Sequence, residues 1–184
     1  MIKKETLAAE QTTIISFEPL SLPQLQTVAA EIIAAMCQYR PEFSRLIWLQ
    51  RRAGTRVTEL FQPNRWEIQN NNVVYCTPQK KNALRVLNFV DIGFKDADEF
   101  QLVVADMRRL PQRQYERAFA KIVADAGLWR LYNDGYIHPS THLLRHLRIK
   151  ELAAEGQPKS FIASWIGEKN EDNLDYYLQS QFYQ

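Results

Sequence analysis

Apolar residues recur at helical spacing through the first third of the chain. Between residues 21 and 38 they form the single stripe expected of a helix with one buried face, made by Leu25, Val28, Ala29, Ile32 and Met36. Ser21 is a suitable cap and Pro23 suits the first turn. The same spacing predicts a second helix over residues 42–53, ending at Gly54, and a short third helix over residues 55–61.

The hydrophobic period changes after Pro63. Three short runs rich in β-branched and aromatic residues follow, and the turn-forming sequences NNN and PQKKNA separate them. These runs predict a small antiparallel sheet with strands over residues 65–69, 73–77 and 84–90.

Helical spacing returns in the second half of the chain. After a loop at residues 131–139, it continues to the end; the predicted helices span residues 96–110, 111–127, 140–156, 158–167 and 171–182. The whole pattern predicts a mainly α, formally α+β, domain with one small three-stranded antiparallel sheet.

Composition limits the class of protein. A chain of 184 residues with 46% hydrophobic residues can bury one core, so we expect one domain over residues 13–184 after a flexible tail at residues 1–12. The charged start and the absence of any run of roughly 20 apolar residues indicate a soluble, cytoplasmic protein.

Cys37 and Cys76 make no metal-binding pattern and are expected to be reduced core thiols. Neither GxGxxG nor a P-loop occurs, so we expect no nucleotide cofactor.

Charge is segregated along the chain although the net charge is only +2. Such segregation can build a basic face for a polyanion, or each run can simply be a solvated helix face. The basic clusters are Arg40, Arg45, Arg51, Arg52 and Arg56, then Arg108, Arg109, Arg113 and Arg117, then Arg145, Arg148 and Lys150.

Polar residues with catalytic chemistry occur in a recognisable order. Arg56 follows a glycine at a helix start, Lys80 and Lys81 stand at a hairpin tip, and His142 and Arg145 are three residues apart on one helix face. A tyrosine pair, Tyr176 and Tyr177, follows Gly167 by about three helical turns.

Each of these residues also has a structural interpretation. Arg56 and Glu59 have the spacing of a surface ion pair, and lysines at a turn often only improve solubility. His142 could be half-buried in its helix, and the tyrosines could anchor the last helix.

Taken together, the ordered motifs resemble the catalytic domain of the tyrosine recombinases, or phage-type integrases, from about Leu20 to Tyr177. AGTRVTEL is similar to the family's G-x-R-x-x-E-L motif, with Arg56 as the first arginine and Glu59 as its structural acid. THLLRH is similar to the H-x-L-R-H box at His142, Leu144, Arg145 and His146. The spacing from Gly167 favours Tyr177 over Tyr176 as the nucleophile, and Lys80, or Lys81, matches the hairpin lysine.

The resemblance implies a DNA strand-exchange enzyme that works without metal or ATP. Tyrosine would attack a DNA phosphodiester to form a 3′-phosphotyrosine link. Arg56 and Arg145 would hold the phosphate, and Lys80 would protonate the leaving 5′ oxygen. His142 would either help take the tyrosine proton or hold a phosphate oxygen. The implied partner is double-stranded DNA, bound by a tetramer. The resemblance also implies that the family's core-binding domain is absent from this chain.

Glu168 departs from the family, which usually has histidine or tryptophan after this glycine. A carboxylate there would repel the phosphate unless it is protonated, turned away or paired with an arginine. The alternatives are therefore a non-catalytic DNA-binding protein with the same fold, a type IB topoisomerase-like relaxing enzyme, and a helical domain with no role on DNA.

Overall fold

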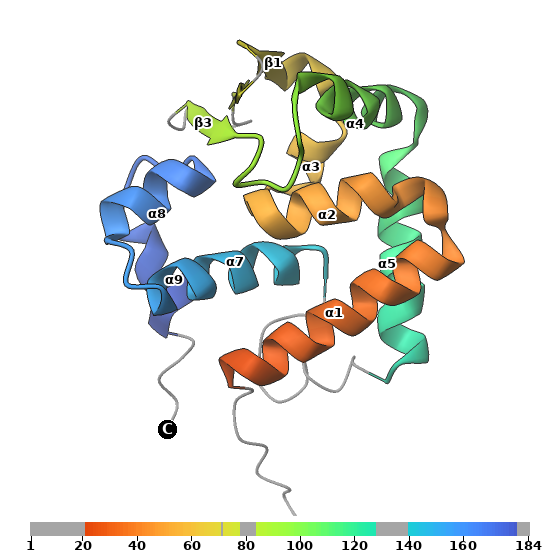
Figure 1. Ribbon diagram of the computed structural model, residues 1–184. Coiled ribbons are helices and arrows are strands. Elements are labelled where there is room, and N and C mark those ends of the chain that lie inside the picture. The colour runs from red at the N-terminus through yellow and green to blue at the C-terminus, as the bar shows by residue number, and fades with distance from the viewer. Residues whose placement is uncertain (1–20, 71, 78–83, 128–139, 180–184) are drawn as a thin grey trace, which may run out of the picture.

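The computed structural model describes residues 21–70, 72–77, 84–127 and 140–179 (Figure 1). The described part is mainly helical and contains a three-stranded antiparallel sheet, which confirms the predicted fold class. The predicted tail at residues 1–12, the hairpin lysines Lys80 and Lys81, and the loop at residues 131–139 lie outside the described residues.

Helix α1 (Leu22–Tyr39) runs along one side of the molecule and packs against α2 (Ser44–Ala53), α5 (Gln112–Asp125) and α7 (His142–Ala154) (Figure 1). Its start is fixed locally, because the backbone N–H of Ser21 donates to Gln24 Oε1 at 2.7 Å and the hydroxyl of Ser21 accepts from the backbone of Gln24. The predicted second helix begins with a 3₁₀ turn (Pro41–Phe43) before α2. These helices enclose most of the core.

The sheet has the order β1 (Trp66–Ile68), β2 (Val73–Cys76), β3 (Arg85–Asn88), and all neighbours are antiparallel. Side chains alternate along β3, so that Arg85 and Leu87 point inward while Val86 is 56% exposed. The inward position of Arg85 brings a charged group into the interior beside the helices.

The remaining helices complete the domain around α7. The predicted third helix is a single turn, α3 (Val57–Leu60), and α4 (Ala97–Arg109) follows the sheet. Helix α8 (Lys159–Ile166) packs against both β3 and α7, and α9 (Asn173–Gln179) packs against α7. The C-terminal ends of α2 and α8 meet the N-terminal half of α7.

Two of these ends are made by glycines in the left-handed conformation. Gly54 has φ 64° after α2, and Gly167 has φ 71° after α8. A residue with a side chain would be strained at these φ values, so glycine allows each helix to stop and the chain to turn sharply. Arg56 lies two residues after Gly54 and Glu168 directly after Gly167, and both are predicted site residues.

Both cysteines are free thiols, as expected. Cys76 lies in the core, where burial raises its pKa to about 11, and Cys37 is half-buried against the core. Within the described ranges, the helices are all too short or too polar to cross a bilayer.

Candidate active site

Arg145 is the centre of the candidate site. Its side chain is fully buried on α7, and Nη1 donates to the carbonyls of Gly54 at 2.8 Å and Ile166 at 3.1 Å. These two carbonyls come from the ends of α2 and α8, so three helices fix the direction of one guanidinium group. Burial lowers the pKa of Arg145, and the nearby charges of Arg56 and Arg85 lower it further.

Arg56 is held beside it by Glu59. Glu59 is fully buried, and its Oε1 accepts from Arg56 Nη1 at 3.2 Å while its Oε2 accepts from the backbone N–H of Arg56 at 3.0 Å. The two residues do form an ion pair, as the structural interpretation suggested. The pair is not a surface one, because Glu59 lies in the interior. Burial acts to lower the pKa of Arg56, but the charges of Glu59 and Glu168 outweigh it and raise that pKa.

Arg85 was not among the predicted site residues, yet it pairs with Glu59, the acid that holds Arg56. It is fully buried, its Nη1 donates to Glu59 Oε2 at 3.2 Å, and its Nε donates to the carbonyl of Trp165 at 2.8 Å. Its Nη2 also donates to the carbonyl of Ala53. The sequence signal was an arginine in phase with the inward-facing Leu87 on a short strand, a position that needs a buried partner.

Glu168 is the residue on which the two predicted arginines meet. Its Oε1 accepts from Arg56 Nη2 and, at 3.0 Å, from Arg145 Nη2, and the residue is only 8% exposed. Of the three ways in which a carboxylate could be tolerated here, the structure adopts pairing with arginine, and it pairs with both.

His142 is the first residue of α7; it is exposed at the surface, although neighbouring atoms cover part of its ring. Partial burial of the ring lowers its pKa, and the charges of Arg145 and Arg56 lower it further. A lowered pKa keeps the imidazole neutral at neutral pH, so one ring nitrogen can accept a proton.

The two tyrosines of α9 occupy different environments. Tyr176 is 74% exposed, whereas Tyr177 is half-buried and its ring lies 4.5 Å from the ring of His146, centroid to centroid. Tyr177 is also close enough to Arg145 for its phenol to affect the pKa of that guanidinium, although less than burial does. Tyr177 is thus the tyrosine of α9 that packs more closely against α7, while Tyr176 stays exposed.

The structure brings together Arg56, Arg145 and Glu168 by direct contact. His142 and Tyr177 lie near enough to Arg145 for electrostatic interaction with it. Lys80, the sixth predicted residue, lies outside the described residues together with Lys81. Across the described ranges, no group of three or more histidine, cysteine, aspartate or glutamate side chains is placed to hold a metal ion.

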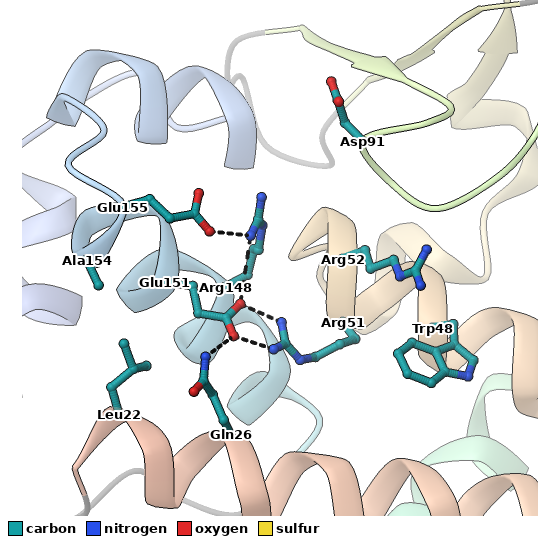
Figure 2. Close-up of a pocket in the computed structure, with 10 residues that line it drawn as sticks. All are labelled: Leu22, Gln26, Trp48, Arg51, Arg52, Asp91, Arg148, Glu151, Ala154 and Glu155. Carbon is teal, nitrogen blue, oxygen red and sulfur yellow. Dashed lines mark hydrogen bonds and ion pairs between the residues drawn. The ribbon is translucent and has the colours of Figure 1, made fainter.

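A hollow separate from this cluster lies between α1, α2 and α7, with a volume of about 490 Å³ (Figure 2). Two of its arginines are paired with an acid, since Arg51 donates to both oxygens of Glu151 and Arg148 lies 3.8 Å from the same carboxylate. None of the five predicted site residues that the structure describes lines this hollow.

This neutralisation extends to other parts of the basic clusters. Arg45 pairs with Asp106 at 2.7 Å, and Arg40 pairs with Glu42 at 2.6 Å. Much of the positive charge that the sequence groups into clusters is therefore compensated by acids, some of them distant along the chain.

Comparison with family models gives no match, and comparison with curated proteins gives none either. Solved structures do match. The fold is that of the tyrosine recombinase catalytic domain, as the sequence motifs indicated.

Three structures illustrate the likeness. A lambda integrase dimer bound to a COC′ core site is 16% identical with a TM-score of 0.64, over 85% of this chain and 47% of that chain. XerA recombinase is 15% identical with a TM-score of 0.57, over 91% and 66%. XerH site-specific recombinase bound to its difH substrate before cleavage is 15% identical with a TM-score of 0.56, over 86% and 49%. The present chain therefore spans about half to two thirds of the length of these proteins.

Proposed function

We propose that this chain binds double-stranded DNA and breaks and rejoins its strands through a 3′-phosphotyrosine link, as a site-specific recombinase. The observation that carries the proposal is the meeting of Arg56 and Arg145 on one carboxylate oxygen, 3.0 Å from Arg145 Nη2. Two guanidinium groups around a single oxygen form a place suited to a non-bridging oxygen of a phosphodiester. The recombinases with the same fold, two of them in complex with DNA sites, support this choice of ligand.

In the proposed reaction, Tyr177 Oη attacks phosphorus and the bond to the 5′ oxygen breaks. The pentavalent transition state gains negative charge, so Arg56 and Arg145 bind it more strongly than the ground state. Lys80 gives a proton to the leaving 5′ oxygen, and the 5′-hydroxyl of a second strand later reverses the step. One phosphodiester replaces another, so the exchange needs no ATP.

The tyrosine proton needs an acceptor, because a phenol with a pKa near 10 is mostly protonated at neutral pH. We assign this role to His142. Its lowered pKa and its place beside the two arginines support the assignment, since a neutral imidazole can take the proton.

A nicked suicide substrate tests the proposal, because loss of the short cleaved product traps the covalent intermediate. We expect a protein–DNA adduct that Tyr177→Phe abolishes. Tyr176→Phe is the matched control. It removes a phenol hydroxyl from the neighbouring residue, which is 74% exposed. If the unaltered chain forms no adduct at any protein concentration, the proposal that it cleaves DNA is wrong.

A second candidate is a DNA-binding protein without catalysis. It is favoured by Glu168, whose carboxylate neutralises part of the charge that a phosphate would need. The affinity of such a protein for duplex DNA would fall steeply with salt. A plot of log affinity against log salt concentration would have a slope of about −0.9 for each phosphate neutralised. The protein would form no adduct. A topoisomerase-like enzyme would instead relax supercoiled DNA without preference for a site.

We further propose that residues 13–184 act as the catalytic unit and assemble as a tetramer on two DNA sites. Sedimentation of the chain with a duplex carrying its target would measure this assembly. A complex with one chain per duplex at saturating protein would contradict it.

A further inference from the structure

The carboxylate of Glu168 occupies the space between the two predicted phosphate-binding arginines. Its main chain is fixed, because Gly167 ends α8 in the left-handed conformation and the N–H of Glu168 donates to the carbonyl of Ala163 at 2.8 Å. Only the side chain is therefore free to leave the pair, by rotation about its own bonds.

Formal charge shows what this contact does to the site. The buried cluster holds three arginines and two glutamates: Arg56, Arg85, Arg145, Glu59 and Glu168. Glu59 is shared by Arg85 and Arg56, so it compensates one of the three positive charges. Glu168 compensates a second, and the cluster offers an incoming phosphate one net positive charge where it could offer two.

Neither guanidinium group depends on Glu168 for its place. Arg145 is held by two backbone carbonyls, at 2.8 and 3.1 Å, and Arg56 is held by Glu59 at 3.2 Å. If the carboxylate leaves, the two groups remain directed at the same space. That space then suits another anionic oxygen, because the donors are already oriented for one.

We propose that Glu168 is an internal competitor for the phosphate and thereby sets the affinity of the site for the DNA backbone. A phosphodiester oxygen and the carboxylate oxygen need the same two donors, so one binds only when the other has left. The identity of the ligand as DNA rests on the function proposed above; the competition for an anion does not.

The first test uses inorganic phosphate as the probe, measured by titration calorimetry. Glu168→Gln removes the carboxylate and keeps nearly the same shape, and we expect it to bind phosphate about tenfold more tightly than the unaltered chain. Glu155→Gln is the matched control, because it removes one negative charge from the C-terminal end of α7, where the Glu155 side chain is 52% exposed and contacts Arg148. The control should change phosphate affinity by less than about twofold.

Equal or weaker phosphate binding by a folded Glu168→Gln chain would overturn the proposal, because a purely structural carboxylate leaves the arginines less ordered when it is lost. Folding is checked by thermal melting. Glu168→His replaces Glu168→Gln in this test if the latter does not fold. We expect the same gain in phosphate affinity from it.

A measurement on the unaltered chain needs no variant. In its complex with a duplex, a phosphate oxygen should lie between Arg56 and Arg145 while the side chain of Glu168 is turned away. A complex in which Glu168 still contacts both arginines while the phosphate is bound would overturn the proposal.

The two proposals fail in different ways. If Glu168→Gln gains phosphate affinity but no DNA adduct forms, competition by Glu168 is supported and recombinase activity is rejected. If a DNA adduct forms and phosphate affinity is unchanged, recombinase activity is supported and competition by Glu168 is rejected.

Discussion

The ring of His146 lies against the ring of Tyr177, with their centroids 4.5 Å apart, while the ring of Tyr176 is 6.1 Å away. His146 directly follows Arg145 on α7, so one helix carries both a predicted phosphate ligand and the ring against which the predicted nucleophile packs. The contact gives a physical reason why Tyr177 is half-buried while the adjacent Tyr176 stays exposed.

We therefore predict that His146 orients Tyr177. His146→Ala should lower the rate of adduct formation by about 10²-fold, because a shift of about 1 Å in a reacting group has an effect of that size. His146→Phe keeps a ring of similar size and should retain most of the rate. Peptide mapping of the adduct gives the sharper result: Tyr176 should appear as an attachment site in His146→Ala only. Equal rates and exclusive Tyr177 attachment in both variants would contradict the prediction.

The same histidine should make stability depend on pH. Burial lowers the pKa of His146 to about 3, and its Nδ1 is buried without a hydrogen-bond partner among the described residues. An unfolded histidine has a pKa near 6.5, so below that pH the unfolded chain binds a proton that the folded chain does not. The folded state must lose stability as the pH falls from 6.5.

Between pH 8 and pH 5 this effect should lower the free energy of unfolding by about 2 kcal/mol. Urea denaturation at both pH values measures it, and the difference between the unaltered chain and His146→Phe isolates it from other titrating groups. His146→Phe should lose about 2 kcal/mol less over this pH range. Parallel losses in the two proteins would show that His146 is not the source.

Loss of either predicted phosphate ligand should slow the chemistry. Arg56→Met and Arg145→Met should each lower the single-turnover cleavage rate by about 10²- to 10³-fold, because each removes a donor that acts on developing charge. Arg109→Met is the control, since Arg109 is 63% exposed and its partner is Asp106, on the same helix. Cleavage that falls equally in the control would indicate a general loss of DNA attraction.

Arg85 should matter for stability first. Arg85→Met leaves Glu59 with less compensation and removes the donor to the carbonyls of Ala53 and Trp165, so it should lower the free energy of unfolding by about 3–5 kcal/mol. Arg109→Met again serves as the control and should change stability by no more than about 0.5 kcal/mol. A loss below about 1 kcal/mol for Arg85→Met would mean that the buried network contributes little.

Much of the fold could be predicted from sequence because its signals are local. The stripe from Leu25 to Met36, the capping pair Ser21 and Gln24, and the glycines at residues 54 and 167 determine where helices begin and end through contacts within a few residues. Helix bounds nevertheless shifted where packing acts, and the predicted helix at residues 55–61 is the single turn Val57–Leu60.

The charge pattern could not be interpreted without coordinates. Arg51 and Glu151 are 100 residues apart, and Arg45 and Asp106 are 61 apart. Pairs of this kind form only when α2 packs against α7 and α4, so a basic cluster in the sequence gave no measure of the charge left on the surface.

By itself, the sequence determined the helices, the sheet and the identity of the groups that could meet, because helical and strand periods and short motifs act over neighbouring residues. Only the tertiary structure decided what Glu168 does. Whether a carboxylate after Gly167 faces water or two arginines depends on how α8 packs against α7 and on the buried Arg85 and Glu59, which lie more than 80 residues earlier in the chain. Those contacts place donors around one point in space, and no local pattern specifies that point.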